Sequence, residues 1–229
     1  MHEKESGLLD GSIHTFVLRS GRLTEAQRRA IEKFGSKYIV PFAETFLDLN
    51  SLFPEKRPLV LEIGFGMGQA TWQIAQARAQ FNYLGIEVYT SGVGRLIIDL
   101  ERHELKNVRI IQHDAIKVLK NMIPPESLAG IHVFYPDPWP KKRHHKRRLM
   151  QDAVVALMAE KLGADGYLYF VTDIEEYASF AKASLGSCTA LKNRFDGYAP
   201  HQPWRPETKF ENHAKNSGRG TFELFYIKG

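Results

Sequence analysis

The sequence contains very little cysteine and no long apolar segment. Cys188 is the single cysteine among 229 residues, so no internal disulfide can form, which is usual in the reducing cytoplasm where we expect this chain. No apolar stretch approaches the roughly 20 residues that cross a bilayer, so we expect no membrane association. Residues 1–5 mix charges and lead into no apolar segment, so no secretory signal is expected. The nine histidines show no paired metal-ligand spacing, and we expect no metal.

The composition is that of a soluble globular protein with an excess of positive charge. Hydrophobic residues make up 43% and charged residues 25%, and 229 residues fit a single domain with a full core. Lysine and arginine outnumber aspartate and glutamate by 31 to 26, a net charge of +5. This balance favours polyanionic partners, because cationic side chains displace counterions condensed on phosphates.

The N-terminal part predicts one helix. Thr24 followed by Gln27 has the spacing of a capping box, which satisfies two N–H groups at a helix start. Pro41 is expected to kink or split this helix. We expect residues 1–55 to form a basic arm and a helix packed on the core, and residues 56–229 to form the main domain. The apolar positions that recur at helical spacing are Ile31, Phe34, Tyr38, Ile39, Phe42 and Phe46.

After Pro58 short apolar runs alternate with helical patterns, which indicates an α/β fold with a mostly parallel sheet and helices on both faces. Ligands of such sheets bind beyond the carboxyl ends of the strands. The predicted strands are 59–63, 83–88, 108–112, 131–135, 167–171 and an edge-paired 221–227. The predicted helices are 69–79, 93–105, 115–122, one through 150–162, and 175–185.

The first predicted strand ends in a glycine-rich turn. Gly64, Gly66 and Gly68 alternate, which lets the backbone turn sharply and approach a ligand. Gln69 stands where the dinucleotide fingerprint needs its third glycine, and no phosphate-binding lysine follows, so neither a nicotinamide site nor a P-loop is indicated. The preceding acid, Glu62, suits a cationic methionine group better than a pyrophosphate. The turn alone could also be a plain strand-to-helix connection.

Acids also follow the next two predicted strands. Glu87 lies about 20 residues after the glycines, where a carboxylate can accept ribose hydroxyls, or it is a solvated residue at a strand end. Asp114 is suited to accept from an adenine amino group, to cap the next helix, or both. Together with Glu62 these acids indicate one pocket for S-adenosylmethionine.

The fourth predicted strand leads into a proline-framed aspartate, in the order Pro136-Asp137-Pro138-Trp139-Pro140. The prolines stiffen the backbone and hold Asp137 extended at the ligand edge. A rigid turn around a buried tryptophan is the structural alternative.

A basic run follows immediately, Lys141-Lys142-Arg143-His144-His145-Lys146-Arg147-Arg148. Six full positive charges in eight residues repel one another, and they lead into a predicted helix whose N-terminus prefers negative charge. Local stability disfavours this arrangement, so we expect the run to bind phosphates. A solvated charge run or a localisation signal would be the alternative.

Three further features point to the same edge. Asp173 ends the fifth predicted strand, and residues 201–211 with 218–220 form a loop rich in proline, glycine and charge. An N-terminal basic set could extend a phosphate track, and it consists of Arg19, Arg22, Arg28 and Arg29.

The glycine turn and the proline-framed aspartate joined to the basic run resemble the tRNA (guanine-N7)-methyltransferases over nearly the whole chain. The resemblance implies a Rossmann-like, mostly parallel seven-stranded sheet with an antiparallel C-terminal strand. It also implies methyl transfer from S-adenosyl-L-methionine to N7 of the variable-loop guanine of tRNA (position 46), leaving S-adenosyl-L-homocysteine. Members occur as monomers and dimers, so no oligomeric state is implied.

The resemblance also assigns roles residue by residue. Asp137 is implied to be both catalytic and donor-binding. The implied donor-binding residues are Glu62, Gly64, Gly66, Gly68, Glu87, Asp114 and Asp137. The implied substrate contacts are Lys141, Asp173, Thr208, Lys209, Phe210 and Glu211, and the implied RNA-binding segment is Arg143, His144, His145, Lys146, Arg147 and Arg148.

Three other functions remain open at this point. Amino-methyltransferases of adenine or cytosine resemble this chain after strand four, but they carry a second proline where Trp139 stands. A non-catalytic RNA-binding module would not need the pocket acids and glycines. A small-molecule methyltransferase would leave the basic run unexplained.

Overall fold

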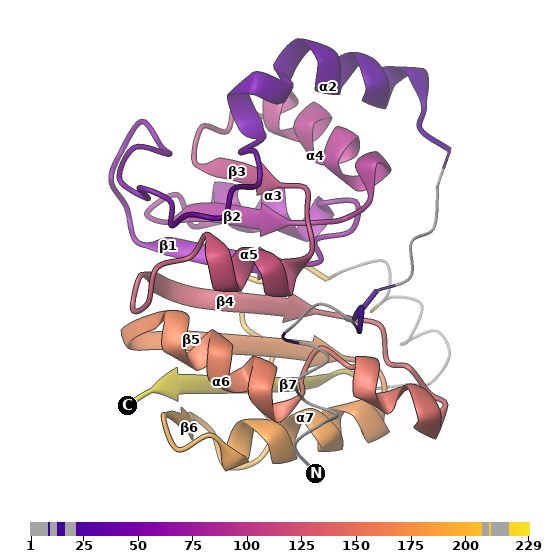
Figure 1. The fold of residues 1–229 in the computed structure, drawn as a ribbon, viewed down its shortest axis with the longest axis vertical. Helices are drawn as coiled ribbons and strands as arrows, with labels where there is room; N and C mark the ends of the chain where they lie inside the picture. Colours follow the sequence, from indigo (N-terminus) through magenta and orange to yellow (C-terminus); the bar gives the residue numbers. More distant parts are fainter. Residues whose placement is uncertain (1–8, 10–12, 17–21, 208–210, 212–219) are drawn as a thin grey trace. The chain divides into compact units, whose positions relative to one another are not determined.

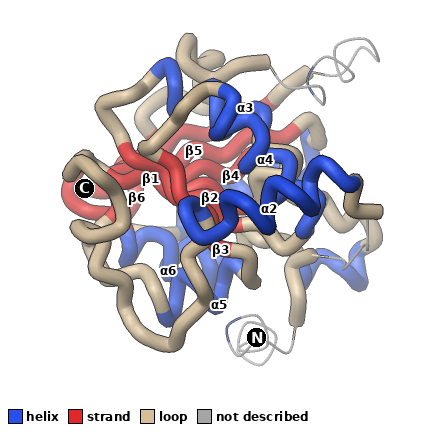
Figure 2. Tube along the Cα trace, turned by 90° about the horizontal axis from the view of Figure 1, so that it is seen from above, coloured by secondary structure: helices blue, strands red, loops and turns tan. Residues whose placement is uncertain are grey.

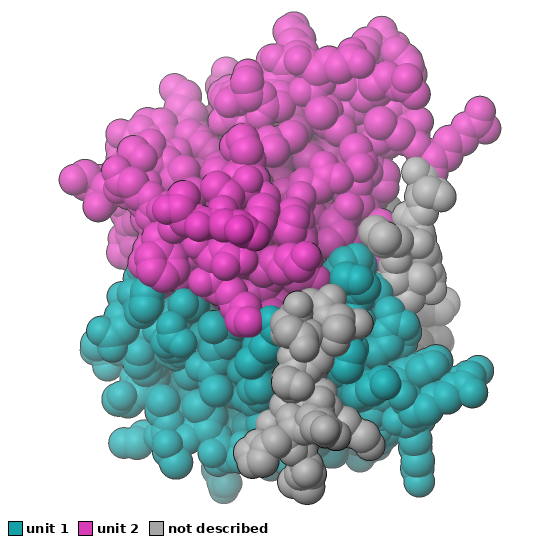
Figure 3. Space-filling view, viewed as in Figure 1, with its two compact units in different colours: residues 1–17, 125–201, 207–229 teal, residues 18–124, 202–206 magenta. Residues whose placement is uncertain are grey.

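The computed structural model describes residues 9, 13–16, 22–207, 211 and 220–229 (Figure 1). These residues divide into two compact units, coloured separately in Figure 3. Unit 1 comprises residues 1–17, 125–201 and 207–229, and unit 2 comprises residues 18–124 and 202–206.

Unit 2 is built from three parallel strands and four helices. Strand β1 (Leu59–Ile63) pairs with β2 (Asn82–Ile86), which pairs with β3 (Val108–Ile111). All residues of β1 and β2 are buried, as expected for parallel strands covered on both faces. The helices are α2 (Glu25–Tyr38), α3 (Gln69–Ala77), α4 (Thr90–Arg102) and α5 (Ala115–Asn121). Figure 2 shows α3 and α4 on one side of these strands and α5 on the other.

The start of α2 confirms the predicted capping box. The Thr24 hydroxyl accepts the Gln27 N–H at 3.3 Å, and the Gln27 side chain accepts the Thr24 N–H at 2.9 Å. The same Gln27 side chain donates to the Ser91 carbonyl at 3.0 Å, and the Tyr38 hydroxyl donates to Glu101 at 2.6 Å. Helix α2 therefore packs along α4, as Figure 1 shows.

The prediction that the helix extends past Pro41, kinked or split there, was wrong. The helix ends at Tyr38, and Ile39 is already extended. The Val40 N–H donates to the Ile110 carbonyl of β3 at 2.8 Å, so pairing with a strand replaces the next helical turn. Proline also disfavours helical backbone in the residue before it.

Unit 1 holds four strands in the order β4-β5-β7-β6. Strand β4 (Leu128–Phe134) is parallel to β5 (Leu162–Thr172), and β7 (Phe222–Lys228) is antiparallel to both β5 and β6 (Leu191–Asn193). The described strands number seven, with β3-β2-β1 in unit 2. The predicted Rossmann-like class, mostly parallel with an antiparallel C-terminal strand, is confirmed.

The helices of unit 1 differ from the sequence prediction in one place. The basic run forms a short 3₁₀ helix of its own, η1 (Lys142–Arg147), and the next helix, α6 (Asp152–Lys161), begins only at Asp152. The positive charges therefore do not occupy the first turn of α6, which instead carries the favourable acid Asp152. The last helix is α7 (Glu175–Ser187).

Candidate active site

The glycine turn after β1 has the geometry that a closely approaching ligand requires. Gly64, Gly66 and Gly68 have φ angles of 72°, 58° and 73°, in the left-handed region that residues with a Cβ rarely adopt. A Cβ placed on Gly64 or Gly66 would meet no atom within 4 Å in the described structure, so open space lies beside both. A Cβ on Gly92 would come within 2.1 Å of the Gly66 carbonyl, so α4 also packs tightly against the turn.

Glu87 braces this turn from the end of β2. Its Oε2 accepts the Gly66 N–H at 2.7 Å, and its Oε1 accepts the N–H groups of Val88 and Tyr89 at 2.7 and 3.1 Å. The side chain is buried, so the alternative of a solvated strand-end acid is wrong. Glu87 therefore ties the glycine turn to the residues that lead into α4.

Glu62 is a buried acid in β1 whose pKa is strongly raised. Its side chain is only 3% exposed, and among the described residues no donor lies within hydrogen-bonding distance of its Oε2. Burial, with a smaller contribution from the negative charge of Glu87, raises the pKa of Glu62 to about 7, while the Thr71 hydroxyl opposes the rise. A buried carboxylate without a counter-charge is suited to a cationic ligand.

Asp114 is confirmed as the cap of α5. Its Oδ1 accepts the Lys117 N–H at 3.0 Å, and the residue is half-buried. The preceding His113 ring stacks on Phe42, with the ring centroids 3.8 Å apart. The predicted donor-binding residues of unit 2 therefore gather at the carboxyl ends of β1, β2 and β3.

The predicted catalytic Asp137 lies in unit 1, beyond the end of β4. It is exposed, and both Tyr135 and Trp139 around it have positive φ angles, 49° and 45°. Bulky residues rarely adopt this conformation, and such strain is concentrated at functional sites. The Tyr135 N–H donates to the Val171 carbonyl of β5 at 2.8 Å, which fixes the start of the loop.

The basic run divides into exposed and buried members. Four cations of the run are exposed, whereas the two histidines and Arg147 are half-buried. Desolvation and the positive charges of Arg143 and Arg147 lower the pKa of His144. The four exposed cations are Lys141, Lys142, Arg143 and Lys146.

The prediction that Arg148 binds RNA is corrected by its burial. The side chain is 1% exposed, and its Nε donates to the Pro138 carbonyl at 2.9 Å. Its Nη2 lies 3.1 Å from both Glu176 and the His145 ring. The guanidinium also lies over the Tyr177 ring, 5.1 Å from its centroid. Its donors are directed into the protein, so Arg148 holds the aspartate loop on α7 and does not face solvent.

The predicted substrate contacts near the C-terminus are only partly described. Asp173 follows β5 and is half-buried. Thr208, Lys209 and Phe210 lie outside the described residues, as do Arg19, Gly218 and Arg219. Among the other predicted N-terminal cations, Arg28 and Arg29 are exposed on α2 and lie 3.9 and 3.4 Å from Glu25.

A cluster of two buried glutamates and an exposed histidine was not predicted from spacing. One ligand atom each of His201, Glu211 and Glu223 lie within 4.8 Å of one another. Glu223 also accepts a hydrogen bond from the Tyr169 hydroxyl and lies 3.2 Å from the His201 ring. Because the members come from separate segments, no local pattern indicates them. Both oxygens of Glu223 have protein partners, the Tyr169 hydroxyl and the His201 ring.

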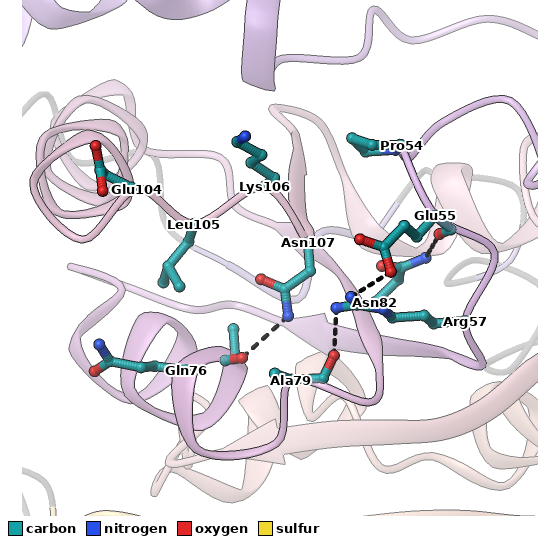
Figure 4. A pocket seen from close by; sticks show the side chains of 11 residues that line it. Pro54, Glu55, Arg57, Gln76, Ala79, Asn82, Glu104, Leu105, Lys106 and Asn107 are labelled. Atoms are coloured by element: carbon teal, nitrogen blue, oxygen red, sulfur yellow. Dashed lines mark hydrogen bonds and ion pairs between the residues drawn. The ribbon is translucent and has the colours of Figure 1, made fainter.

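One hollow lies at the opposite edge of the strands of unit 2. It measures about 250 Å³ and is lined by residues at or just before the strand starts, such as Arg57, Asn82 and Asn107 (Figure 4). The Asn107 amide donates to Ala75, and Arg57 donates to the Ala79 carbonyl. None of the residues predicted to bind S-adenosylmethionine lines this hollow, so it is not the predicted site of the methyl donor. Among the described helices, none is long and apolar enough to cross a membrane.

Comparison with known proteins agrees with the chemistry of these residues. Residues 56–224 match the family described as "Putative methyltransferase". A tRNA (guanine-N(7)-)-methyltransferase of Bordetella pertussis is 49% identical over 93% of this chain and 84% of that protein. One of Paraburkholderia xenovorans is 47% identical over 98% of this chain and 86% of that protein. The solved structure of an rRNA methylase from Streptococcus thermophilus matches with a TM-score of 0.50 and 12% sequence identity. The match covers 76% of this chain and 88% of that one, and at this identity it shows a shared fold alone.

Proposed function

The chain belongs to the tRNA (guanine-N7)-methyltransferase family, and from this premise we propose how its residues transfer a methyl group from S-adenosylmethionine to N7 of the variable-loop guanine of tRNA. The observation that carries the proposal is the buried Glu62 carboxylate behind an open glycine turn. A cytoplasmic location is part of the proposal, supported by tRNA as substrate and by the single cysteine.

The donor pocket is assigned to unit 2. Glu62 would pair with the methionine ammonium group, because that cation supplies the counter-charge that the buried carboxylate needs. Gly64 and Gly66 would admit the donor close to the backbone, since neither has a Cβ and both border open space. Glu87 would accept from the ribose hydroxyls and Asp114 from the adenine amino group. When bound, the donor supplies an electrophilic sulfonium methyl group.

Asp137 is assigned to alignment and charge stabilisation. N7 of guanine carries an in-plane lone pair and no hydrogen, so its attack on a methyl group releases no proton from N7. A general base is therefore not required. Alignment of the reacting atoms alone contributes roughly 7–11 kcal/mol in well-oriented systems. The fixed Asp137 carboxylate would also stabilise the positive charge that develops on the imidazole ring.

The exposed cations of the basic run are assigned to tRNA phosphates. Lys142, Arg143 and Lys146 are exposed on η1, and the exposed Lys141 directly precedes this helix. Asp173 or Glu211 would read the guanine edge, because a carboxylate accepts from N1–H and the 2-amino group together, a donor pair that adenine lacks. The target base must leave its stack at a cost of a few kcal/mol, which the phosphate contacts offset.

Product analysis tests the proposed function directly. The protein is incubated with bulk tRNA and methyl-labelled S-adenosylmethionine, and the tRNA is digested to nucleosides. We expect label in N7-methylguanosine with the parent protein and a large decrease with Asp137→Ala. Label in an amino-methylated adenine or cytosine, or label independent of added tRNA, would contradict the assignment. A parent that binds donor and transfers no label would indicate a non-catalytic RNA-binding module.

A further inference from the structure

Three hydrogen bonds join the aspartate loop and the basic run to the N-terminal segment 14–16. The Trp139 Nε1–H donates to the Thr15 carbonyl at 3.1 Å. The Arg147 Nε–H donates to the His14 carbonyl at 2.9 Å, and its Nη2 donates to the Phe16 carbonyl at 2.7 Å. All of these residues belong to unit 1. The guanidinium thus directs two of its five donors at main-chain carbonyls of one short segment.

Arg147 and Trp139 also contact each other. The Arg147 guanidinium carbon lies 3.7 Å from the centroid of the Trp139 ring, a close cation–π contact. The His144 ring meets Trp139 edge-on, with the centroids 5.8 Å apart. Trp139 is therefore fixed on its face by Arg147 and at its N–H edge by Thr15.

This fixation acts on a strained backbone. Tyr135 and Trp139, on the two sides of Asp137, both have positive φ angles. Such conformations persist only where the surroundings determine them. Before Asp137, the Tyr135 N–H donates to the Val171 carbonyl of β5. After Asp137, the Arg148 guanidinium donates to the Pro138 carbonyl, next to Trp139. The Trp139 side chain itself is held by Arg147 and segment 14–16.

We propose that Arg147, together with segment 14–16, is a positioning residue that holds Trp139 and thereby the Asp137 carboxylate, and that it is not one of the phosphate contacts. This inference rests on the proposed function, because Asp137 is assigned its role there. The guanidinium suits the task because it is planar: it stacks on the ring while its N–H edge reaches two carbonyls. A lysine at this position would lack both the flat face and the fork of donors.

Substitution by lysine separates positioning from phosphate binding. A phosphate contact tolerates lysine, since an ammonium group binds phosphate as a point charge. Positioning does not tolerate it. We therefore compare Arg147→Lys and Arg147→Ala with Arg143→Lys and Arg143→Ala, because Arg143 is an exposed arginine on the same 3₁₀ helix. Thermal unfolding of each variant confirms that it is folded.

The readouts are the single-turnover methylation rate at saturating tRNA and donor, and the tRNA affinity as a function of salt. Both Arg147 variants should transfer the methyl group about 10- to 100-fold more slowly, the effect of misplacing a reacting group by about 1 Å, with tRNA affinity and salt slope as in the parent. Arg143→Ala should bind tRNA more weakly with a smaller salt slope, and Arg143→Lys should retain more of that binding. A parental rate in Arg147→Lys, or weaker binding with a smaller salt slope in Arg147→Ala, would overturn the proposal.

A spectroscopic measurement tests the same contact without activity. The fluorescence of Trp139 is obtained as the difference between the parent and Trp139→Phe, and again in an Arg147→Lys background. We expect that difference spectrum to change when the stacked guanidinium is replaced, and an unchanged spectrum would refute the contact. A parent that makes no N7-methylguanosine would refute the proposed function instead, so the two failures are distinguishable.

Discussion

Glu62 couples the stability of the free protein to pH. Its pKa rises from an ordinary value of 4.5 in the unfolded chain to about 7 in the folded protein, because burial disfavours the charged form. The folded state therefore binds a proton that the unfolded state has released, and stability falls as the pH rises from about 4.5 to 7. The decrease from this one group amounts to about 3 kcal/mol.

Glu62→Gln should remove that dependence. At pH 8 we expect the variant to have the higher free energy of unfolding in urea, and at pH 4.5 we expect it to gain no such advantage, since the parent side chain is then neutral. Donor affinity should decrease, because the amide does not neutralise a bound ammonium group. If the difference between parent and variant were the same at both pH values, the ionisation of Glu62 would not be coupled to folding.

Asp137 distinguishes alignment from proton transfer. Asp137→Asn keeps the size and one acceptor but removes the charge, so the single-turnover rate should fall by an amount equivalent to roughly 1.5–3 kcal/mol, the scale of a charge-assisted hydrogen bond. Asp137→Ala should be slower still, because it also removes the acceptor. Equal inactivity of both variants, with normal donor and tRNA binding, would favour a proton-transfer role. A parental rate in Asp137→Ala would remove this residue from the mechanism.

At the scale of elements, η1 presents its exposed cations, while the half-buried Arg147 bonds to segment 14–16. Replacing Lys142, Arg143 and Lys146 together by alanine should weaken tRNA binding and reduce its salt dependence. The log–log slope should decrease by about 0.9 for each phosphate that these side chains no longer neutralise, if the bound RNA is duplex. Donor affinity, measured by calorimetric titration, should stay unchanged, since the predicted pocket acids are untouched. An unaltered salt slope would show that these side chains are only solvated.

Helix and strand positions were predicted best where local patterns dominate. The first strand and the capping box of α2 follow from apolar runs and from the Thr24–Gln27 spacing, and both are confirmed. The end of α2 was missed because pairing of Val40 with β3 competes with the next helical turn. Strand β6 was not located, since its three residues, Leu191–Asn193, acquire their conformation by pairing with β7.

At the scale of the whole molecule, the sequence by itself determined the fold class and the local geometry of the glycine turn and the α5 cap. The period of the apolar residues reflects the repeat of the local backbone. The glycine turn and the acids Glu62, Glu87 and Asp114 lie at or just after strand ends, which that period locates. Glycine at positive φ and an acid at a helix cap are likewise local requirements, so residues such as Gly66 and Asp114 could be assigned from their neighbours alone.

Tertiary structure decided which charges face solvent. In the sequence, the basic run gives no reason to distinguish Arg143, Arg147 and Arg148. In the structure, Arg143 is exposed and Arg147 binds a segment more than 100 residues away in the chain. Arg148 is buried against α7. The cluster of His201, Glu211 and Glu223 has the same origin. Burial and long-range hydrogen bonding depend on residues that are distant in the chain, so no local spacing determines them.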